Sequence, residues 1–306
     1  MSDPTPGVVH ALRGRMGRVG VWLGSLGALP AQQERAAVAE IERHGYGAIW
    51  FGEGPANREA LSHAALLLQA SQRMTVATGI ASIWARDATA AINGANTLNE
   101  GFGDRFLLGL GVSHAPAVNS RGHDYARPLT AMRTYLEAIA AGTYHAPAPA
   151  EPSPVVIAAL GPKMLELARE RTAGAHPYFV PPEHTARARA ALGPDRLLAP
   201  EQVVVLERDP ARARELGRRH MALYLMLPNY VNNLHALGYT EQDVSGGGSD
   251  RLVDAIVAWG EADRIAERVR EHLAAGADHV AVQPYADTEH EALEQLKALA
   301  PVLLGL

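Results

Sequence analysis

The sequence predicts an α/β fold, and within that class a (β/α)8 barrel, on three observations. Short apolar segments typical of buried strands alternate with longer amphipathic segments typical of helices along nearly the whole chain. Eight strand–helix units fit into 306 residues, which suits a single barrel. No fixed-period repeat accompanies the alternation, so a barrel with insertions is favoured over a solenoid. A doubly wound open sheet is the alternative fold.

Each expected strand is a short apolar run bounded by glycine, proline or polar residues. Residues 47–51, for example, run from a glycine turn into consecutive apolar side chains, as in a strand buried on both faces. The expected strands are residues 18–23, 47–51, 74–82, 105–110, 155–159, 175–180, 197–206 and 278–283.

The expected helices follow from apolar periodicity and from their end signals. Ile265, Val269 and Leu273 are spaced four residues apart and therefore share one helix face. Pro30 and Pro162 stand where proline is favoured in a first helical turn. The expected helices are residues 30–44, 58–72, 88–100, 128–141, 162–171, 182–192, 210–237, 262–275 and 289–304.

The remaining segments predict connections. Residues 114–127 have no apolar period and predict a loop, residues 146–154 a proline-rich connector, and residues 245–249, with three glycines, a flexible loop. We expect an N-terminal tail at residues 1–17 and one barrel domain over residues 18–306.

Composition narrows the function classes. The formal net charge of −5 is a poor match for nucleic-acid binding, which requires a surface that neutralises phosphates. The chain has no cysteine, which excludes disulfides and thiolate catalysis. Without a signal-type apolar region or a membrane-length apolar run, we expect a soluble, cytoplasmic protein. Only two of the 28 basic residues are lysines, a bias typical of a high-GC, actinobacterial-type genome.

Motifs for metal and serine chemistry are missing. The histidines do not fall into H-E-x-x-H or a similar ligand spacing, so we expect no metal site. No G-x-S-x-G occurs for a nucleophilic serine. Redox chemistry carried by an organic cofactor is therefore the favoured class.

In a barrel the active site lies at the carboxyl ends of the strands. Glu53 follows a buried strand between two glycines, and His114 closes the fourth expected strand, so either could exchange a proton. The alternatives are a solvated acid or a partner of Arg58, and a structural loop histidine. His176 and Tyr178 either point into the barrel or simply pack there.

Residues 159–163 end a strand and open a helix, with Pro162 at its first position and Lys163 beside it. A helix N-terminus with a nearby ammonium can bind an anion such as phosphate. The alternative is a tight turn with a solvated lysine. Gly109 and Gly111 lack the third glycine of a dinucleotide fingerprint, so they more simply allow close backbone approach at the barrel mouth.

These strand ends carry a family resemblance. The stretches are AIWFGEGPANREA (residues 48–60), VATGIASIWARD (76–87), RFLLGLGVS (105–113) and VVIAALGPKM (155–164), joined by residues 249–283. The chain resembles the luciferase-like monooxygenase superfamily, and within it the branch that uses the deazaflavin coenzyme F420. The resemblance spans the chain from residue 18 onward. It implies a TIM barrel of the bacterial luciferase type with insertions, a small-molecule substrate and a homodimer.

The resemblance also assigns residues. A non-proline cis peptide between Gly79 and Ile80 would back the central coenzyme ring, and Glu53 would face the reactive carbon. The other implied contacts are Ser82 to the ring or its ribityl chain, Gly111 and Ser113 along the same pocket, and Ala159, Leu160, Gly161, Pro162 and Lys163 around the ribityl phosphate.

Two departures from the family concern the substrate. His114 stands where the sugar-phosphate dehydrogenase relatives have a catalytic glutamate, and their His–Trp pair after the second strand is absent. Both argue against sugar-phosphate oxidation. We expect F420-dependent hydride transfer, with Glu53 or His114 as proton donor and Arg86 and Lys163 as electrostatic helpers. The alternatives are an FMN-dependent monooxygenase of a two-component system and a non-catalytic flavin-binding relative.

Overall fold

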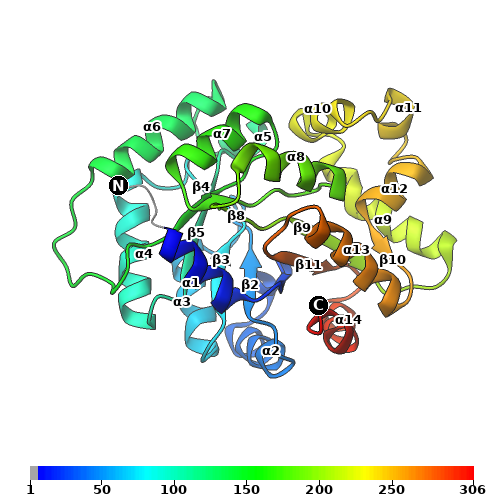
Figure 1. The fold of residues 1–306 in the computed structure, drawn as a ribbon, viewed down its shortest axis with the longest axis horizontal. Helices are drawn as coiled ribbons and strands as arrows, with labels where there is room; N and C mark the ends of the chain where they lie inside the picture. Colours follow the sequence, from blue (N-terminus) through cyan, green and yellow to red (C-terminus); the bar gives the residue numbers. More distant parts are fainter. Residues whose placement is uncertain (1–5) are drawn as a thin grey trace.

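The strands form one parallel sheet that curls into a barrel in the computed structural model, which describes residues 6–306 (Figure 1). Neighbours in order are β1 (Val19–Trp22), β2 (Ala48–Phe51), β3 (Thr75–Thr78), β5 (Phe106–Gly111), β6 (Val155–Ile157), β7 (Gly174–Ala175) and β8 (Leu197–Leu198). On the other side of β1, β11 (Val280–Pro284) pairs with β9 (Glu201–Val205). Because only residues 199–200 separate β8 from β9, these two strands close the barrel. The predicted barrel is confirmed.

Both faces of the strands are buried, which explains their continuous apolar runs. Val21 and Ile49, paired in register, pack outward in the core beneath the helices. Trp50 and Leu107 belong to a separate core cluster together with the small residues Ala48, Ala77 and Ala281. Large and small side chains together fill the barrel at its amino end, so the cavity described below lies at the opposite end.

Helices surround the barrel as predicted, with small shifts at their ends. They are α2 (Ala31–Arg43), α3 (Ala60–Ala70), α4 (Ala88–Phe102), α6 (Pro128–Ala141), α7 (Pro162–Arg171), α8 (Pro182–Leu192), α9 (Pro210–Tyr224), α13 (Ala262–Ala274) and α14 (Glu289–Leu303). Local caps fix several of their starts. Asp87 accepts the amide of Ala90 at α4, and Thr288 forms a capping box at α14.

Five predicted elements differ in detail from the structure. The strand expected at 74–82 is interrupted at the cis peptide Gly79–Ile80, which separates β3 from β4 (Ala81–Ser82). The strand expected at 175–180 stops after Ala175, because Pro177 offers no N–H to a ladder. The strand expected at 197–206 is interrupted at Pro200 for the same reason. The helix expected at 210–237 is split into α9 and α10 (Pro228–Ala236), since Pro228 starts a new helix rather than continuing the first. The loop expected at 114–127 contains α5 (Ala115–Asn119).

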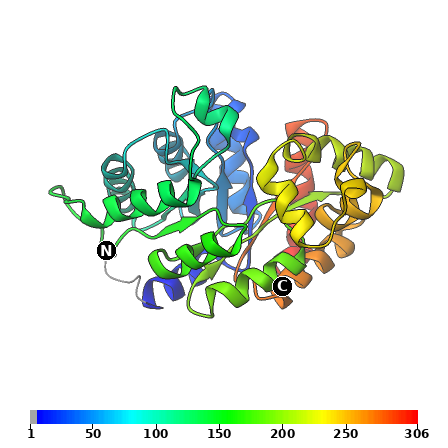
Figure 2. The same cartoon turned by 90° about the horizontal axis from the view of Figure 1, so that it is seen from above.

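The largest insertion forms a helical lobe beside the barrel mouth. It comprises α9, α10, α11 (Glu241–Val244), α12 (Asp250–Ile256) and β10 (Ala258–Trp259), which pairs with β9. Its own core includes Phe179, Met221, Leu234 and Leu252. Figures 1 and 2 show this lobe gathered at one end of the long axis. The expected glycine loop is a turn within the lobe, where Gly246, Gly247 and Gly248 all have positive φ.

Part of the predicted N-terminal tail is a packed helix, α1 (Pro6–Met16). Val9, Leu12 and Met16 are buried in the same cluster as Trp50. Residues 1–5 of the predicted tail lie outside the described residues. The helix therefore covers the amino end of the barrel, away from the strand ends that carry the candidate site.

Candidate functional site

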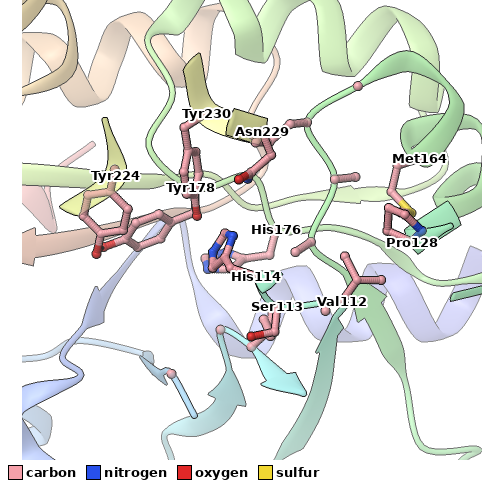
Figure 3. Close-up of a pocket in the computed structure, with 18 of the residues that line it drawn as sticks. Val112, Ser113, His114, Pro128, Met164, His176, Tyr178, Tyr224, Asn229 and Tyr230 are labelled. Carbon is pink, nitrogen blue, oxygen red and sulfur yellow. The ribbon is translucent and has the colours of Figure 1, made fainter. Parts of the chain in front are cut away.

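A cavity of about 380 Å³ opens at the carboxyl ends of the strands. Its volume lies within the range usual for small-molecule sites. Strands β1 to β7 supply one part of its wall, and the helical lobe supplies another (Figure 3). The lining residues are Trp22, Gly52, Glu53, Gly79, Ile80, Gly111, Val112, Ser113, His114, Tyr125, Pro128, Ala158, Ala159, Leu160, Gly161, Met164, His176, Tyr178, Tyr224, Asn229 and Tyr230.

Most residues expected at the site line this one cavity. They are Glu53, Gly79, Ile80, Gly111, Ser113, His114, Ala159, Leu160 and Gly161. Three others do not line it. Ser82 is buried behind the wall, where its hydroxyl accepts the Trp84 amide at 3.3 Å. Pro162 and Lys163 are exposed on the first turn of α7, beyond the lining residue Gly161.

The cavity floor is the bulge between β3 and β4 (Ala81–Ser82), and the Gly79–Ile80 peptide is cis as the resemblance implies. The Gly79 amide donates to Phe51 O at 2.7 Å, and its carbonyl accepts Trp22 Nε1 at 3.2 Å. The Glu53 amide donates to Ile80 O at 3.1 Å. A Cβ on Gly111 would overlap the Ile80 side chain, so only glycine leaves this floor undisturbed.

Glu53 lines the cavity as part of a buried ion pair. Its carboxylate is 3% exposed and pairs with Arg86, whose Nη1 lies 3.1 Å from Oε2. The same carboxylate accepts the amides of Ser82 at 2.8 Å and Ala60 at 3.3 Å. Arg58, the alternative partner considered for Glu53, pairs with Glu34 instead. Glu53, which follows β2, therefore holds the floor bulge in place through its hydrogen bonds to Ser82 and Ile80 and is itself fixed by Arg86.

His114 lies at the end of β5, against the helical lobe. Its ring centroid is 5.5 Å from that of Tyr230, and the Asn229 side chain hydrogen-bonds to it. Burial lowers the pKa of His114 below its usual value, against the opposing effect of Asn229. The imidazole is therefore neutral at pH 7 and can either donate or accept a proton.

Three tyrosines form the wall on the lobe side, and Figure 3 shows them together, across the view from Met164 and Pro128. The hydroxyls of Tyr178 and Tyr224 lie 2.7 Å apart, and Tyr178 also donates to Gln283 Oε1 at 2.8 Å. Burial raises the pKa of Tyr224 to about 12 and that of Tyr178 well above its usual value. These phenols therefore stay protonated at neutral pH.

His176 is a second neutral histidine at the floor. Its Nδ1 donates to the Ala199 carbonyl at 2.6 Å, and its ring stacks on Trp50 with centroids 4.2 Å apart. Nε2 is therefore an acceptor, and it has no hydrogen-bond partner among the described residues. Burial lowers the pKa of His176 to about 4. The sequence left open whether His176 points into the barrel or only packs there. It does both, because it lines the cavity and also stacks on Trp50.

The amino end of α7 closes another side of the cavity. Gly161 is its N-cap residue and has no side chain to cap the first turn, and Pro162 follows at the first helical position. A Cβ at Gly161 would meet nothing within 4 Å, so free space adjoins these helix amides. Lys163 adds a positive charge on the same turn, which suits an anion.

Tyr224, Asn229 and Tyr230 were missed by the sequence interpretation. They stand in a stretch predicted as one continuous helix, where Pro228 was the available signal of a break. Within residues 6–306, no group of three or more histidine or acidic residues could hold a metal ion. In the same range, no helix is both long and apolar enough to span a membrane.

Comparison with known proteins places these features in a family context. The family model for luciferase-like monooxygenases matches residues 16–279. A 5,10-methylenetetrahydromethanopterin reductase of Methanolobus tindarius is 24% identical over 299 residues, covering 83% of this chain and 90% of the relative. A Mycobacterium tuberculosis protein described as a coenzyme F420-dependent oxidoreductase is 26% identical over 329 residues, covering 87% and 94%.

A solved structure shares the fold. The coenzyme F420-dependent tetrahydromethanopterin reductase of Methanopyrus kandleri superimposes with a TM-score of 0.74 at 17% identity, covering 93% of this chain and 98% of that chain. The similarity spans nearly all of both chains. It therefore includes the helical lobe region as well as the barrel.

Proposed function

This chain belongs to the luciferase-like monooxygenase family and is an enzyme of that class, and from this premise we propose that it is an F420-dependent oxidoreductase acting on a small organic molecule. The observation that carries the proposal is the presence, around one cavity, of the Gly79–Ile80 floor and the amino end of α7. The first suits a flat ring and the second suits a phosphate. The two relatives described above, a reductase and an F420-dependent oxidoreductase, support the coenzyme class.

The residues present fit such a coenzyme. Gly52, Gly79 and Gly111 bring bare backbone to the cavity surface, which leaves room for a planar ring. Ala159, Leu160 and Gly161 would carry the ribityl chain toward the free amides of α7, with Lys163 outside them. The neutral Nε2 of His176 lies beneath the floor at Gly79. Bound here, the deazaflavin would supply or take up a hydride at carbon 5 of its ring.

We assign to His114 the role of donating the proton that accompanies hydride transfer. Hydride transfer to a polarised double bond leaves an anion on the substrate, and the protonated ring of His114, held by Asn229, can donate its proton to that anion and return to the neutral form. Glu53 is assigned a positioning role, because its carboxylate already pairs with Arg86 and accepts two backbone amides. Ser82 contributes one of those amides and so supports the floor without lining the cavity.

The description of the matching family model favours a second candidate, a monooxygenase that receives reduced FMN from a partner reductase. Its phosphate could use the same helix end. The third candidate, a non-catalytic flavin-binding relative, would give no turnover with any coenzyme. The homodimer implied by the family resemblance and the cytoplasmic location expected from the sequence belong to the proposal as well.

Two parallel turnover assays, one anaerobic with reduced F420 and one with reduced FMN and oxygen, separate the candidates. Purified protein is mixed with reduced F420 and a panel of ketones, enones and imines, and oxidation of the coenzyme is followed optically. The proposal predicts substrate-dependent oxidation without oxygen. Turnover only with reduced FMN and oxygen would establish the monooxygenase, and no turnover in either arm would overturn both enzymatic candidates.

A further inference from the structure

The wall that faces the floor across the cavity selects the substrate by its chemistry. We propose that the substrate is uncharged and carries a flat, apolar ring that packs against Tyr178, Tyr224 and Tyr230. This inference rests on the proposed function, because the coenzyme ring is taken to occupy the floor at Gly79 and Ile80 and to leave this wall for the substrate.

The charges around the cavity argue for an uncharged molecule. No lysine or arginine is among the described residues that line it. Among the lining residues that the structure describes, only Glu53 carries a formal charge, and Arg86 already neutralises it. A buried carboxylate or phosphate on the substrate would have no counter-ion here, and desolvating an unpaired charge is costly.

The geometry of the tyrosines argues for a ring. Tyr224 and Tyr230 meet edge to face with centroids 5.4 Å apart, and Tyr178 lies 5.2 Å from Tyr224. The hydroxyls of Tyr178 and Tyr224 are occupied by each other and by Gln283. These two residues therefore present mainly aromatic carbon, which favours offset or edge contacts with another ring.

One corner of the wall is polar. Asn229 and His114 meet there, and Figure 3 shows the hydroxyl of Tyr230 pointing toward the centre of the cavity. That hydroxyl forms no hydrogen bond with another described residue. Three neutral groups at one point can bind a single carbonyl-type oxygen, while the rest of the wall contacts the ring. Because the coenzyme ring must share a cavity of about 380 Å³, the substrate is small.

A matched set of probes tests this assignment. Acetophenone, benzoate, phenyl phosphate and acetone are each titrated into the F420-loaded enzyme, with saturation-transfer NMR of the probe as readout. We expect acetophenone to bind at least tenfold more tightly than either anion and than acetone. Equal or tighter binding of benzoate or phenyl phosphate would overturn the uncharged class, and equal binding of acetone would overturn the ring.

Two variants sharpen the test. Asn229→Arg adds a cation to the polar corner and should shift the benzoate-to-acetophenone affinity ratio at least tenfold toward benzoate. Asn232→Arg, on an exposed position of the same helix, is the matched control and should leave the ratio unchanged. An unchanged ratio in Asn229→Arg would place the probes elsewhere and overturn the assignment.

The coenzyme is measured separately on the same preparations. If F420 fails to bind, the proposed function fails, and the probe titration is then read on the protein without coenzyme. The wild-type probe series requires no variant to fold, so it decides the substrate class alone.

Discussion

His114 and Glu53 both follow barrel strands, yet their surroundings give them different roles. His114 is half-buried, neutral at pH 7 and hydrogen-bonded to Asn229, so its ring can exchange a proton with a ligand. We predict that His114→Ala slows turnover by roughly 10²–10⁴-fold while coenzyme affinity changes only a few-fold. Steady-state kinetics and coenzyme titration measure the two effects.

The matched control is His123→Ala, an exposed histidine in the same segment, which should keep wild-type rates. Because burial lowers the pKa of His114 and the donor is its protonated form, turnover limited by this proton transfer should fall as pH rises through a pKa below 6.5. Wild-type turnover by His114→Ala from pH 5 to 9 would remove His114 from the mechanism.

Glu53 should matter for stability before it matters for proton transfer. Glu53→Gln removes one of the two carboxylates that pair with Arg86, which is 9% exposed, and leaves Glu59 at 2.7 Å as its remaining partner. Unfolding free energy should fall by about 2 kcal/mol, the size expected when hydrogen bonds to a charged group are lost while Glu59 still pairs with Arg86. Denaturation in urea measures the loss, and the exposed Glu137→Gln should change stability by less than about 0.5 kcal/mol. Lost turnover at unchanged stability would instead make Glu53 the acid.

At the scale of single elements, the amino end of α7 is the part of the site most specific to a phosphate. We predict that Lys163→Gln weakens F420 binding about fivefold, the size expected for one charge near a helix end. A deazaflavin without the phosphate should bind both proteins equally.

The other lysine provides the control. Lys297 lies on α14, where it pairs with Glu294 at 3.4 Å, and Lys297→Gln should leave coenzyme binding unchanged. If both variants weaken coenzyme binding by the same factor, the effect comes from the overall charge of the protein. The proposed anion site at the amino end of α7 would then be contradicted. Fluorescence titration at two salt concentrations makes the comparison, because surface charge effects are screened by salt.

Elements with strong periodicity could be predicted from the sequence, and so could the strand ends that carry Glu53, Gly79, His114 and Gly161. The lobe could not, because α11, α12 and β10 are too short to show a period. Tyr224, Asn229 and Tyr230 belong to that lobe, so these three lining residues escaped prediction. The burial of the Glu53 side chain could not be predicted either, because no sequence signal indicates that Glu53 pairs with Arg86.

At the scale of the whole molecule, buried titratable groups set how stability depends on pH. Burial lowers the pKa of His176, His220 and His279 to about 4 and that of His272 to about 3, from 6.5. As pH falls below 6.5, the unfolded chain binds protons that the folded chain refuses, so stability is lost down to about pH 4.

Glu201 acts in the opposite direction. Burial raises its pKa from 4.5 to about 8, and its Oε1 has no hydrogen-bond partner in the described chain. Between pH 4.5 and 8 the folded state keeps this proton while the unfolded state releases it. The stability that Glu201 contributes to the folded protein is therefore lost as pH rises from 4.5 to 8.

The melting temperature should therefore fall steeply in acid, where the four histidines outweigh Glu201, and fall more gently as pH rises from 6.5 to 8, where the contribution of Glu201 is lost. We predict that Glu201→Gln gains stability relative to the wild type as pH rises from 5 to 8, because the variant has no proton to lose. Thermal melts across that range measure the difference. A difference that stays constant with pH would show that Glu201 is ionised in the folded protein.

The central claim, that this barrel binds F420, is tested most directly by titrating the purified protein with F420 and, in parallel, with FMN while following coenzyme fluorescence. The account predicts a dissociation constant for F420 in the low micromolar range or tighter, about −8 kcal/mol or better. FMN should bind at least about tenfold more weakly, a gap of about 1.4 kcal/mol. FMN binding equal to or tighter than F420 would contradict the account and assign the cavity to a flavin monooxygenase.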